Sequence, residues 1–296
     1  MVKRIGDLEE LLFASLHDLV FLDYDYLEKY IYVHPEGKSY SKYWISKQMR
    51  TMETEGYVKS FPVAKATVQG RDRLVYTLDS KGVQEVKEIL GEADWDTRWT
   101  QRTPTYIFHS LRMSHVQAVY ASLKDDFYRF TEYFSERRAF RNYGEFLTDK
   151  EGKKKQPATT VIRPDGAFLL ERDVNGQTIK FLFFVELERS RQRIDVTLNK
   201  IRRYNEYVRK KAFENDAIFG DGVRVVRVLF ISNNDTERNK LCENAKKADT
   251  REIEKIGGSL LFATFAEVTT NPYGEIWKSK NSTDPNHLYS LYKKIE

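Results

Sequence analysis

Apolar residues recur at helical spacing through the first part of the chain and then give way to strand-like stretches. Leucines in residues 7–20 return every three to four positions, which predicts a helix, and a second short helix follows around 24–32. After a break at Pro35 and Gly37, residues 41–55 predict a third helix. The remaining predicted elements are strands over 57–65 and 73–78 and a closing helix over 79–90. The order is three helices, a β-hairpin and a further helix.

The rest of the chain alternates between longer apolar runs and amphipathic segments. The runs FLFFVEL and VVRVLFI are continuous, so they predict strands that are covered on both faces. The predicted elements are a helix over 106–127, a first strand within 127–141, strands over 161–172, 180–190, 223–232 and 259–268, and helices over 196–211 and 235–256. This order predicts an α/β domain with a central mixed sheet flanked by helices.

The length supports two domains. The chain has 296 residues, and single domains usually hold about 100–200. We predict a first domain over 1–92, a linker over 93–105 and a second domain over 106–296. The linker contains Trp95 and Trp99, which we expect to pack against other residues.

Composition excludes several classes of protein. Hydrophobic residues make up 41% and aromatic residues 14%, which is too much for a disordered chain. No apolar run reaches the roughly 20 residues of a membrane span, and the charged N-terminal stretch is unlike a signal peptide, so we predict a cytoplasmic protein. The single cysteine, Cys242, cannot form an internal disulfide, and no zinc-finger spacing is present.

Charge is distributed unevenly along the chain, although the net charge is only +5. Residues 1–37 hold three basic and eight acidic residues, whereas 38–73 hold eight basic and three acidic ones. A second basic stretch, 189–211, holds nine basic and two acidic residues. Such clusters are typical of surfaces that bind phosphate, but a charged helix face that only contacts solvent is an equally good interpretation of the charge pattern alone.

The first domain resembles winged helix-turn-helix DNA-binding domains. The resemblance is carried by MRTMETEGYVKSF, by the basic hairpin and by VYTLDSKG, which ends in Tyr-x-Leu-x-x-x-Gly. It implies that the third helix enters the major groove and that the hairpin, or wing, touches the DNA backbone or the minor groove. The residues placed against DNA are Tyr40, Lys42, Tyr43, Lys47 and Arg50 on the helix side and Lys65, Arg71 and Arg73 on the wing. The alternative is a winged helix used only for protein contacts or dimerisation.

Acidic residues at the ends of predicted strands point to a metal site in the second domain. Pro164-Asp165 and Glu186-x-Glu188, in this order of elements, resemble the PD-(D/E)xK nuclease fold. Glu186 and Glu188 lie two apart on a strand and so share one side. In that fold Asp165 and Glu186 would hold Mg²⁺, which activates water and stabilises charge on a phosphate.

The pattern departs from that fold at Glu188, where a lysine is usual. Lys200 or Arg203 on the next helix would then supply the missing positive charge, and the catalytic residues would be Asp165, Glu186, Glu188 and Lys200. Without catalysis, Asp165 is a turn residue, and the glutamates end a strand that nearby arginines neutralise.

Both halves together resemble the plasmid replication-relaxation family. The matching residues are Arg163-Pro164-Asp165, Val185 to Ser190, and Lys200-Ile201-Arg202-Arg203-Tyr204. The resemblance implies double-stranded DNA binding in plasmid replication, relaxation or mobilisation, with Arg189, Arg202 and Arg203 as further DNA-binding residues. A homodimer and contacts with other replication or mobilisation proteins are also expected.

Three functions therefore remain open: a DNA-binding protein of a mobile element, a Mg²⁺-dependent endonuclease or nickase, and a transcriptional regulator whose second domain serves oligomerisation or effector sensing.

Overall fold

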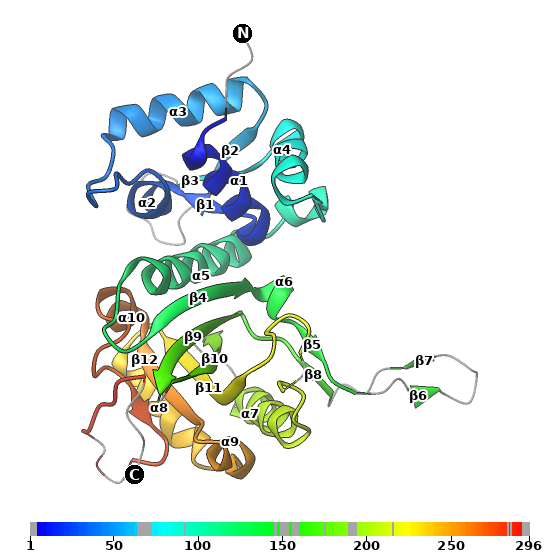
Figure 1. Ribbon diagram of the computed structural model, residues 1–296, viewed down its shortest axis with the longest axis vertical. Helices are drawn as coiled ribbons and strands as arrows, with labels where there is room; N and C mark the ends of the chain where they lie inside the picture. Colours follow the sequence, from blue (N-terminus) through cyan, green and yellow to red (C-terminus); the bar gives the residue numbers. More distant parts are fainter. Residues whose placement is uncertain are drawn as a thin grey trace. The chain divides into compact units, whose positions relative to one another are not determined.

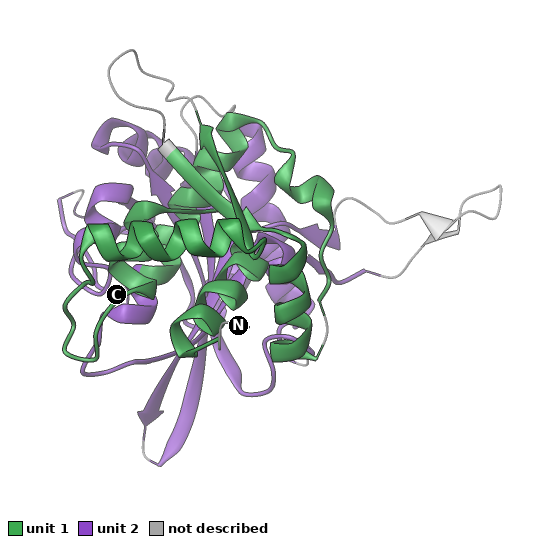
Figure 2. Ribbon diagram, turned by 90° about the horizontal axis from the view of Figure 1, so that it is seen from above, with its two compact units in different colours: residues 1–118 green, residues 119–296 purple. Residues whose placement is uncertain are grey.

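The computed structural model describes most of the chain. The described residues are 5–63, 73–91, 93–144, 147–148, 154–155, 160–174, 176–188, 194–214, 216–282, 284 and 286–291. The chain divides into two compact units, residues 1–118 and 119–296 (Figure 2). This division lies within helix α5 (Pro104–Ser122), whereas the sequence places the end of the first domain at residue 92.

The first unit contains the helices and the hairpin that the sequence predicts (Figure 1). Its elements are α1 (Asp7–Leu19), β1 (Leu22–Asp23), α2 (Tyr24–Tyr26), a π-helical turn (Leu27–Ile31), α3 (Lys42–Thr54), β2 (Val58–Val63), β3 (Arg73–Leu78), α4 (Ser80–Leu90), a 3₁₀ turn (Thr97–Thr100) and α5. The three strands form a sheet in the order β1-β3-β2, with both pairings antiparallel. Strand β1 was not predicted, because two residues carry no periodicity.

Local sequence explains where the elements of the first unit begin and end. Ser41 caps α3 by accepting a hydrogen bond from the Trp44 amide, and Gly56, in the left-handed region at φ 82°, ends it. Gly82 on α4 is required by a close approach, since a Cβ there would lie 2.1 Å from the Tyr57 carbonyl oxygen. That contact gives the glycine of the Tyr-x-Leu-x-x-x-Gly pattern a structural reason.

The predicted linker is part of the first unit and packs on its other residues. Trp95 and Trp99 lie edge to face, with ring centroids 5.6 Å apart, on a small core that includes Phe21, Val75 and Leu111. The packing of two partly buried indoles explains why this stretch has an ordered position although its sequence has no periodicity.

The second unit is built on a mixed six-stranded sheet in the order β13-β12-β11-β10-β9-β4 (Figure 1). The strands are β4 (Arg129–Ser135), β9 (Gly166–Val174), β10 (Gln177–Leu187), β11 (Val223–Ser232), β12 (Ser259–Thr264) and β13 (Lys278–Ser279). The pairs β10–β11 and β11–β12 are parallel, and the other pairs are antiparallel. Short pairs β5 (Arg141–Asn142) with β8 (Val161–Ile162), and β6 (Leu147–Thr148) with β7 (Lys154–Lys155), lie outside this sheet. The prediction of a central mixed sheet flanked by helices is confirmed.

Helices cover both faces of this sheet. The helices of the second unit are α6 (Glu136–Ala139), α7 (Ile194–Arg209), α8 (Asp235–Ala245), α9 (Arg251–Lys255) and α10 (Phe265–Thr270). On one face, residues of α7, α8 and α9 pack on Leu182, Val228 and Phe262. On the other face, Phe168 stacks on Phe183, and Tyr120, at the end of α5, stacks on Phe168. Dense burial on both faces explains the continuous apolar runs of β10 and β11.

Three elements that were predicted as continuous are divided in the structure. The strand predicted over 161–172 is split at Arg163–Asp165, so Asp165 precedes β9 instead of lying within a strand. The predicted helix 235–256 is divided into α8 and α9. The stretch 259–268 changes from β12 to α10 at Thr264, whose side chain forms a capping box with Glu267.

Candidate functional site

Two glutamates end the central strand β10 beneath helix α7. Glu186 is paired with Phe230 of β11, and the amide of Glu188, just past the strand, donates to the Ile231 carbonyl at 2.8 Å. Both side chains are buried, with 1% and 2% exposure. The alternation of the strand places them on the α7 side, together with Leu182 and Phe184.

Asp165 is held beside the same strand end. Its amide donates to the Val185 carbonyl at 3.0 Å, and its Oδ2 accepts from the Leu187 amide at 2.7 Å. The bend at Arg163–Asp165 therefore sets the Asp165 carboxylate next to the residues that flank Glu186.

Helix α7 brings two more polar side chains to Glu186. The Lys200 ammonium lies 2.6 Å from Glu186 Oε2 and 3.2 Å from Glu188 Oε1. One turn later, the buried Tyr204 hydroxyl donates to Glu186 Oε1 at 2.5 Å. Positions four apart on a helix share one face, so the spacing Lys-x-x-x-Tyr itself delivers both groups.

The charges in this cluster do not balance. Three carboxylates face one ammonium, and burial raises the pKa of Glu186 to about 7, with Asp165 and Glu188 adding to the rise and Lys200 opposing it. Burial disfavours the charged form of Lys200, but the three carboxylates outweigh it and raise the Lys200 pKa. Burial also raises the pKa of Tyr204, which therefore keeps its proton as a donor. Lys200 stays charged, and Glu186 takes up a proton more readily than a free glutamate.

Glu186→Gln is expected to flatten the dependence of stability on pH. The folded-state pKa of about 7 lies above the ordinary glutamate pKa of 4.5, so between these values the native state holds a proton that the unfolded chain releases. The native state therefore loses stability as pH rises through about 7. Glutamine mimics the protonated form at every pH. The free energy of unfolding of the variant minus that of wild type should increase by up to about 3 kcal/mol as pH rises from 5 to 8. Urea denaturation at each pH measures both values.

Glu206→Gln on the same helix is the matched control. Glu206 is paired with Arg209 near the surface, and this arginine lowers its pKa. Its removal should change stability by at most about 0.5 kcal/mol, without the gain at high pH. Parallel pH curves for wild type and Glu186→Gln would contradict the charge imbalance described above.

A cavity of about 350 Å³ opens onto this cluster. Its lining residues are Ile162, Arg163, Glu186, Val196, Asn199, Lys200, Arg203 and Tyr204. Arg163 is exposed and lies over the Phe140 ring at 5.3 Å, and neither Arg163 nor Arg203 has an ion pair in the part of the chain that the structure describes. Two arginines thus line the same cavity as Glu186, and guanidinium groups attract an anionic group such as a phosphate diester.

The donor set suits a hard divalent cation. Asp165 and Glu186 offer carboxylate oxygens, which Mg²⁺ prefers, and Lys200 now neutralises part of the charge that a cation would neutralise. A cation bound there would favour the ionised form of Glu186.

Helix α3 presents a second polar surface. Ile45, Met49 and Met52 are buried on its inner side. The outer side lines a hollow of about 600 Å³ formed by Lys42, Tyr43, Ser46, Lys47, Arg50, Thr51, Thr54 and Glu55. Tyr43 is 80% exposed, and Lys42, Lys47 and Arg50 have no ion pair with any described residue. The basic side chains of this face are therefore available to a partner.

Several other predicted DNA-binding residues have different surroundings. Tyr40 is stacked between His34 and Trp44, at centroid distances of 3.7 and 4.3 Å, so its ring is already packed. Arg202 is exposed on α7, donates to Asn199 and does not line the cavity. Lys65, Arg71 and Arg189 lie outside the described residues, and of Arg73 only the backbone, in β3, is described.

Sequence reasoning missed two members of the cluster as site residues. Tyr204 belonged to a motif, but its link to Glu186 requires the packing of α7 on the sheet. Arg163 belongs to the Arg-Pro-Asp motif, and the motif alone does not predict that this residue lines the cavity. The i, i+4 spacing of Lys200 and Tyr204 was the pattern that could have indicated the tyrosine.

A family comparison covers both units. The profile of the replication-relaxation family matches residues 13–222, which include α3, the Asp165 bend, Glu186, Glu188 and helix α7. The chain belongs to the replication-relaxation family. Membership of this family indicates a role in plasmid replication or relaxation.

Other comparisons add little. A structure of the restriction endonuclease FokI bound to DNA is 14% identical, with a TM-score of 0.29, over 91% of this chain. This chain covers 45% of that chain, and a likeness this weak carries no argument. A search of curated proteins found no match to this chain. None of the helices in its described part is both long and apolar enough to cross a membrane.

Proposed function

We propose that this replication-relaxation protein binds double-stranded DNA, with the first unit acting as a winged helix-turn-helix that selects the site. The observation that carries the proposal is the outer face of α3, where Lys42, Lys47 and Arg50 line a hollow without ion pairs to other described residues. Basic residues that no acidic partner neutralises attract phosphates, and a helix face of this kind fits the major groove.

Glu53, an acidic residue of α3, does not oppose this role. Glu53 accepts from the Ser60 amide at 2.9 Å and from the Ser60 hydroxyl at 2.7 Å, so its carboxylate is tied to β2. The Glu53 carboxylate is therefore occupied by hydrogen bonds within the first unit. Tyr43 adds an exposed aromatic ring that can contact sugar or a base edge.

The second unit would hold DNA beside the carboxylate cluster. Arg163 and Arg203 are the basic residues at its cavity, and Lys200 lies deeper, between the two glutamates. Guanidinium groups bind phosphate through two parallel hydrogen bonds, so they suit a backbone contact without sequence preference.

A second candidate is a Mg²⁺-dependent endonuclease of the PD-(D/E)xK type. It is favoured by Glu186 and Glu188, which both contact the Lys200 ammonium, and by Asp165, whose carboxylate is held at the same strand end. Asp165 and Glu186 would hold the cation, which lowers the pKa of water and stabilises charge on a phosphate. Lys200, arriving from α7, takes the place of the lysine expected at position 188 and would neutralise the phosphate, and Tyr204 would orient Glu186.

Binding of the full-length protein to a duplex DNA tests the first proposal. Affinity should fall steeply with salt, because each protein–phosphate contact contributes a slope of about −0.9 in log K against log salt concentration. We expect contacts from both units, so the slope should have a magnitude of at least about 4. Fluorescence anisotropy at several salt concentrations measures it. If the protein is a regulator that binds through the winged helix alone, the slope should be shallower. An affinity that does not depend on salt would contradict the DNA-binding proposal. The homodimer, the cytoplasmic location and contacts with other replication or mobilisation proteins remain expectations.

A further inference from the structure

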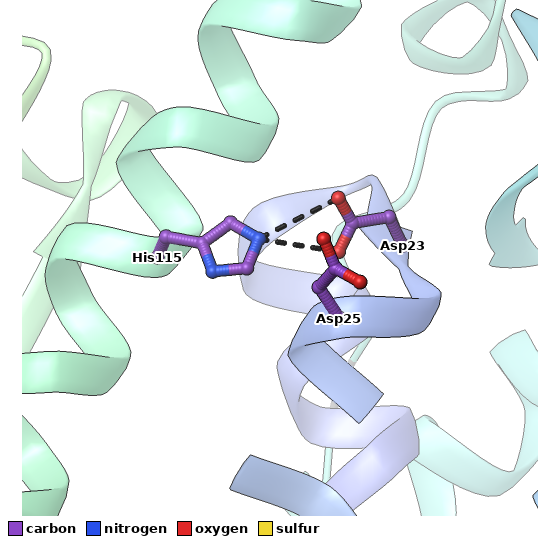
Figure 3. Close-up of side chains that lie close together, drawn as sticks. All are labelled: Asp23, Asp25 and His115. Carbon is purple, nitrogen blue, oxygen red and sulfur yellow. Dashed lines mark hydrogen bonds and ion pairs between the residues drawn. The ribbon is translucent and has the colours of Figure 1, made fainter. Parts of the chain in front are cut away.

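Three metal-ligand side chains lie together in the first unit, apart from the residues discussed above (Figure 3). Asp23 and Asp25 flank the start of α2, and His115 comes from α5, more than ninety positions later. One ligand atom from each lies within 4.8 Å of the other two. His115 Nε2 is 3.2 Å from Asp23 Oδ1 and 3.5 Å from Asp23 Oδ2.

The surrounding structure holds these groups in place. Asp23 is 1% exposed and caps α2 by accepting from the Tyr26 amide at 2.9 Å. The His115 side chain is 14% exposed, and its ring meets the rings of Tyr26 and Tyr30 edge to face, at 6.2 and 6.3 Å. A carboxylate fixed by a backbone bond and an imidazole fixed by two aromatic rings leave little conformational freedom to lose on binding an ion.

We propose that Asp23, Asp25 and His115 form a site for a divalent transition metal ion such as Zn²⁺, Mn²⁺ or Co²⁺. One imidazole nitrogen with two carboxylates is a mixed donor set that suits first-row transition metals, whereas Mg²⁺ prefers oxygen ligands alone. Three protein ligands leave the remaining positions to water. The ion would take the place of the direct His115–Asp23 hydrogen bond.

Such an ion would link two distant segments of the first unit. Asp23 and Asp25 belong to the junction of β1 and α2, and His115 belongs to α5, the helix that continues past residue 118 into the second unit. Because the ligands converge only in the folded chain, the ion would stabilise the native state in proportion to its occupancy.

The competing interpretation is a buried histidine–aspartate hydrogen bond with no ion. That pair needs only His115 and Asp23, whereas the metal site also uses Asp25 as a third ligand. Asp25 is therefore the informative position, and it lies at a half-buried place where substitution leaves the core intact.

Zn²⁺ and Co²⁺ titrations of the full-length protein test the site. The titrated protein carries Asp165→Asn, which removes a ligand of the other candidate cation site. This protein is the background into which the other substitutions are introduced. We expect one bound ion, a rise in Tm of at least about 3 °C at saturation, and Co²⁺ absorption bands of a nitrogen-containing site. Asp25→Asn and His115→Gln should each weaken binding at least about tenfold and remove the Tm shift.

Glu28→Gln, an acidic residue on the adjoining π-helical turn, is the matched control and should bind like the background. Two outcomes overturn the proposal. One is equal Zn²⁺ affinity, or no Zn²⁺ binding, in the background and in Asp25→Asn. The other is a loss of Tm in His115→Gln that is the same with and without Zn²⁺, as a purely structural pair predicts. If His115→Gln fails to fold, Asp25→Asn alone decides.

Discussion

Replacing Lys47 and Arg50 together with alanine is expected to weaken duplex DNA binding by the full-length protein about 100-fold at physiological salt. The two side chains lie on the outer face of α3, line the same hollow and lack ion pairs within the described structure, so nothing in that part of the chain competes with DNA for them. Each lost contact costs about 1–2 kcal/mol, and a factor of ten in affinity corresponds to about 1.4 kcal/mol. If both side chains contact phosphates, the magnitude of the salt slope should also fall by about 2.

A control with the same loss of charge separates a local contact from a general electrostatic effect. Lys87 on α4 and Lys240 on α8 are exposed, and the double alanine variant changes the net charge equally. Its affinity should stay within about threefold of wild type. If both double variants lose affinity equally, α3 does not bind in the major groove of the DNA. Tm values of all proteins should agree, because none of the four side chains is buried.

Asp165→Ala is expected to abolish metal-dependent cleavage of supercoiled plasmid. With Mg²⁺ or Mn²⁺ the wild type should produce nicked or linear DNA, and Asp165→Ala or Glu186→Gln should lower the rate at least about 100-fold by removing a cation ligand. Lys200→Met should lower it as strongly for a different reason, since it removes the positive charge next to the phosphate. Only Lys200→Met should keep or strengthen Mn²⁺ affinity, because the ammonium that contacts both glutamates is gone.

Glu206→Gln again provides the matched control on α7 and should cleave at the wild-type rate. A second outcome is that the wild type binds DNA and yet cuts no supercoiled plasmid under the same conditions. That result would contradict the endonuclease proposal and would leave the DNA-binding proposal intact. Cleavage that persists in Asp165→Ala would point to a contaminating nuclease.

Much of the fold was predictable from local pattern. The helix over 41–55 and the strand over 180–190 appear as α3 and β10 with shifts of at most three residues, because each has a strong periodicity or a long apolar run. Boundaries failed where a short element or a cap intervened. Thr264 starts a helix inside an apolar stretch, and the two-residue strand β1 carries no pattern at all.

The candidate site was predictable in its residues but not in its contacts. Strand alternation requires Glu186 and Glu188 to share a side, and that follows from sequence. The approach of Lys200 to both glutamates, and of Tyr204 to Glu186, depends on how α7 crosses the sheet. Spacing along one element says nothing about the neighbour that packs against it.

The sequence by itself determined the family, the two-part organisation and the set of acidic and basic residues that carry the proposed chemistry. These depend on periodicity and on motifs within single elements. The tertiary structure decided which charges meet: one ammonium for three carboxylates, a tyrosine on Glu186, and His115 beside Asp23 across more than ninety residues. Burial and long-range contact set those pairings, because the free energy of a charge depends on the groups that replace its water, and only the folded chain brings them together.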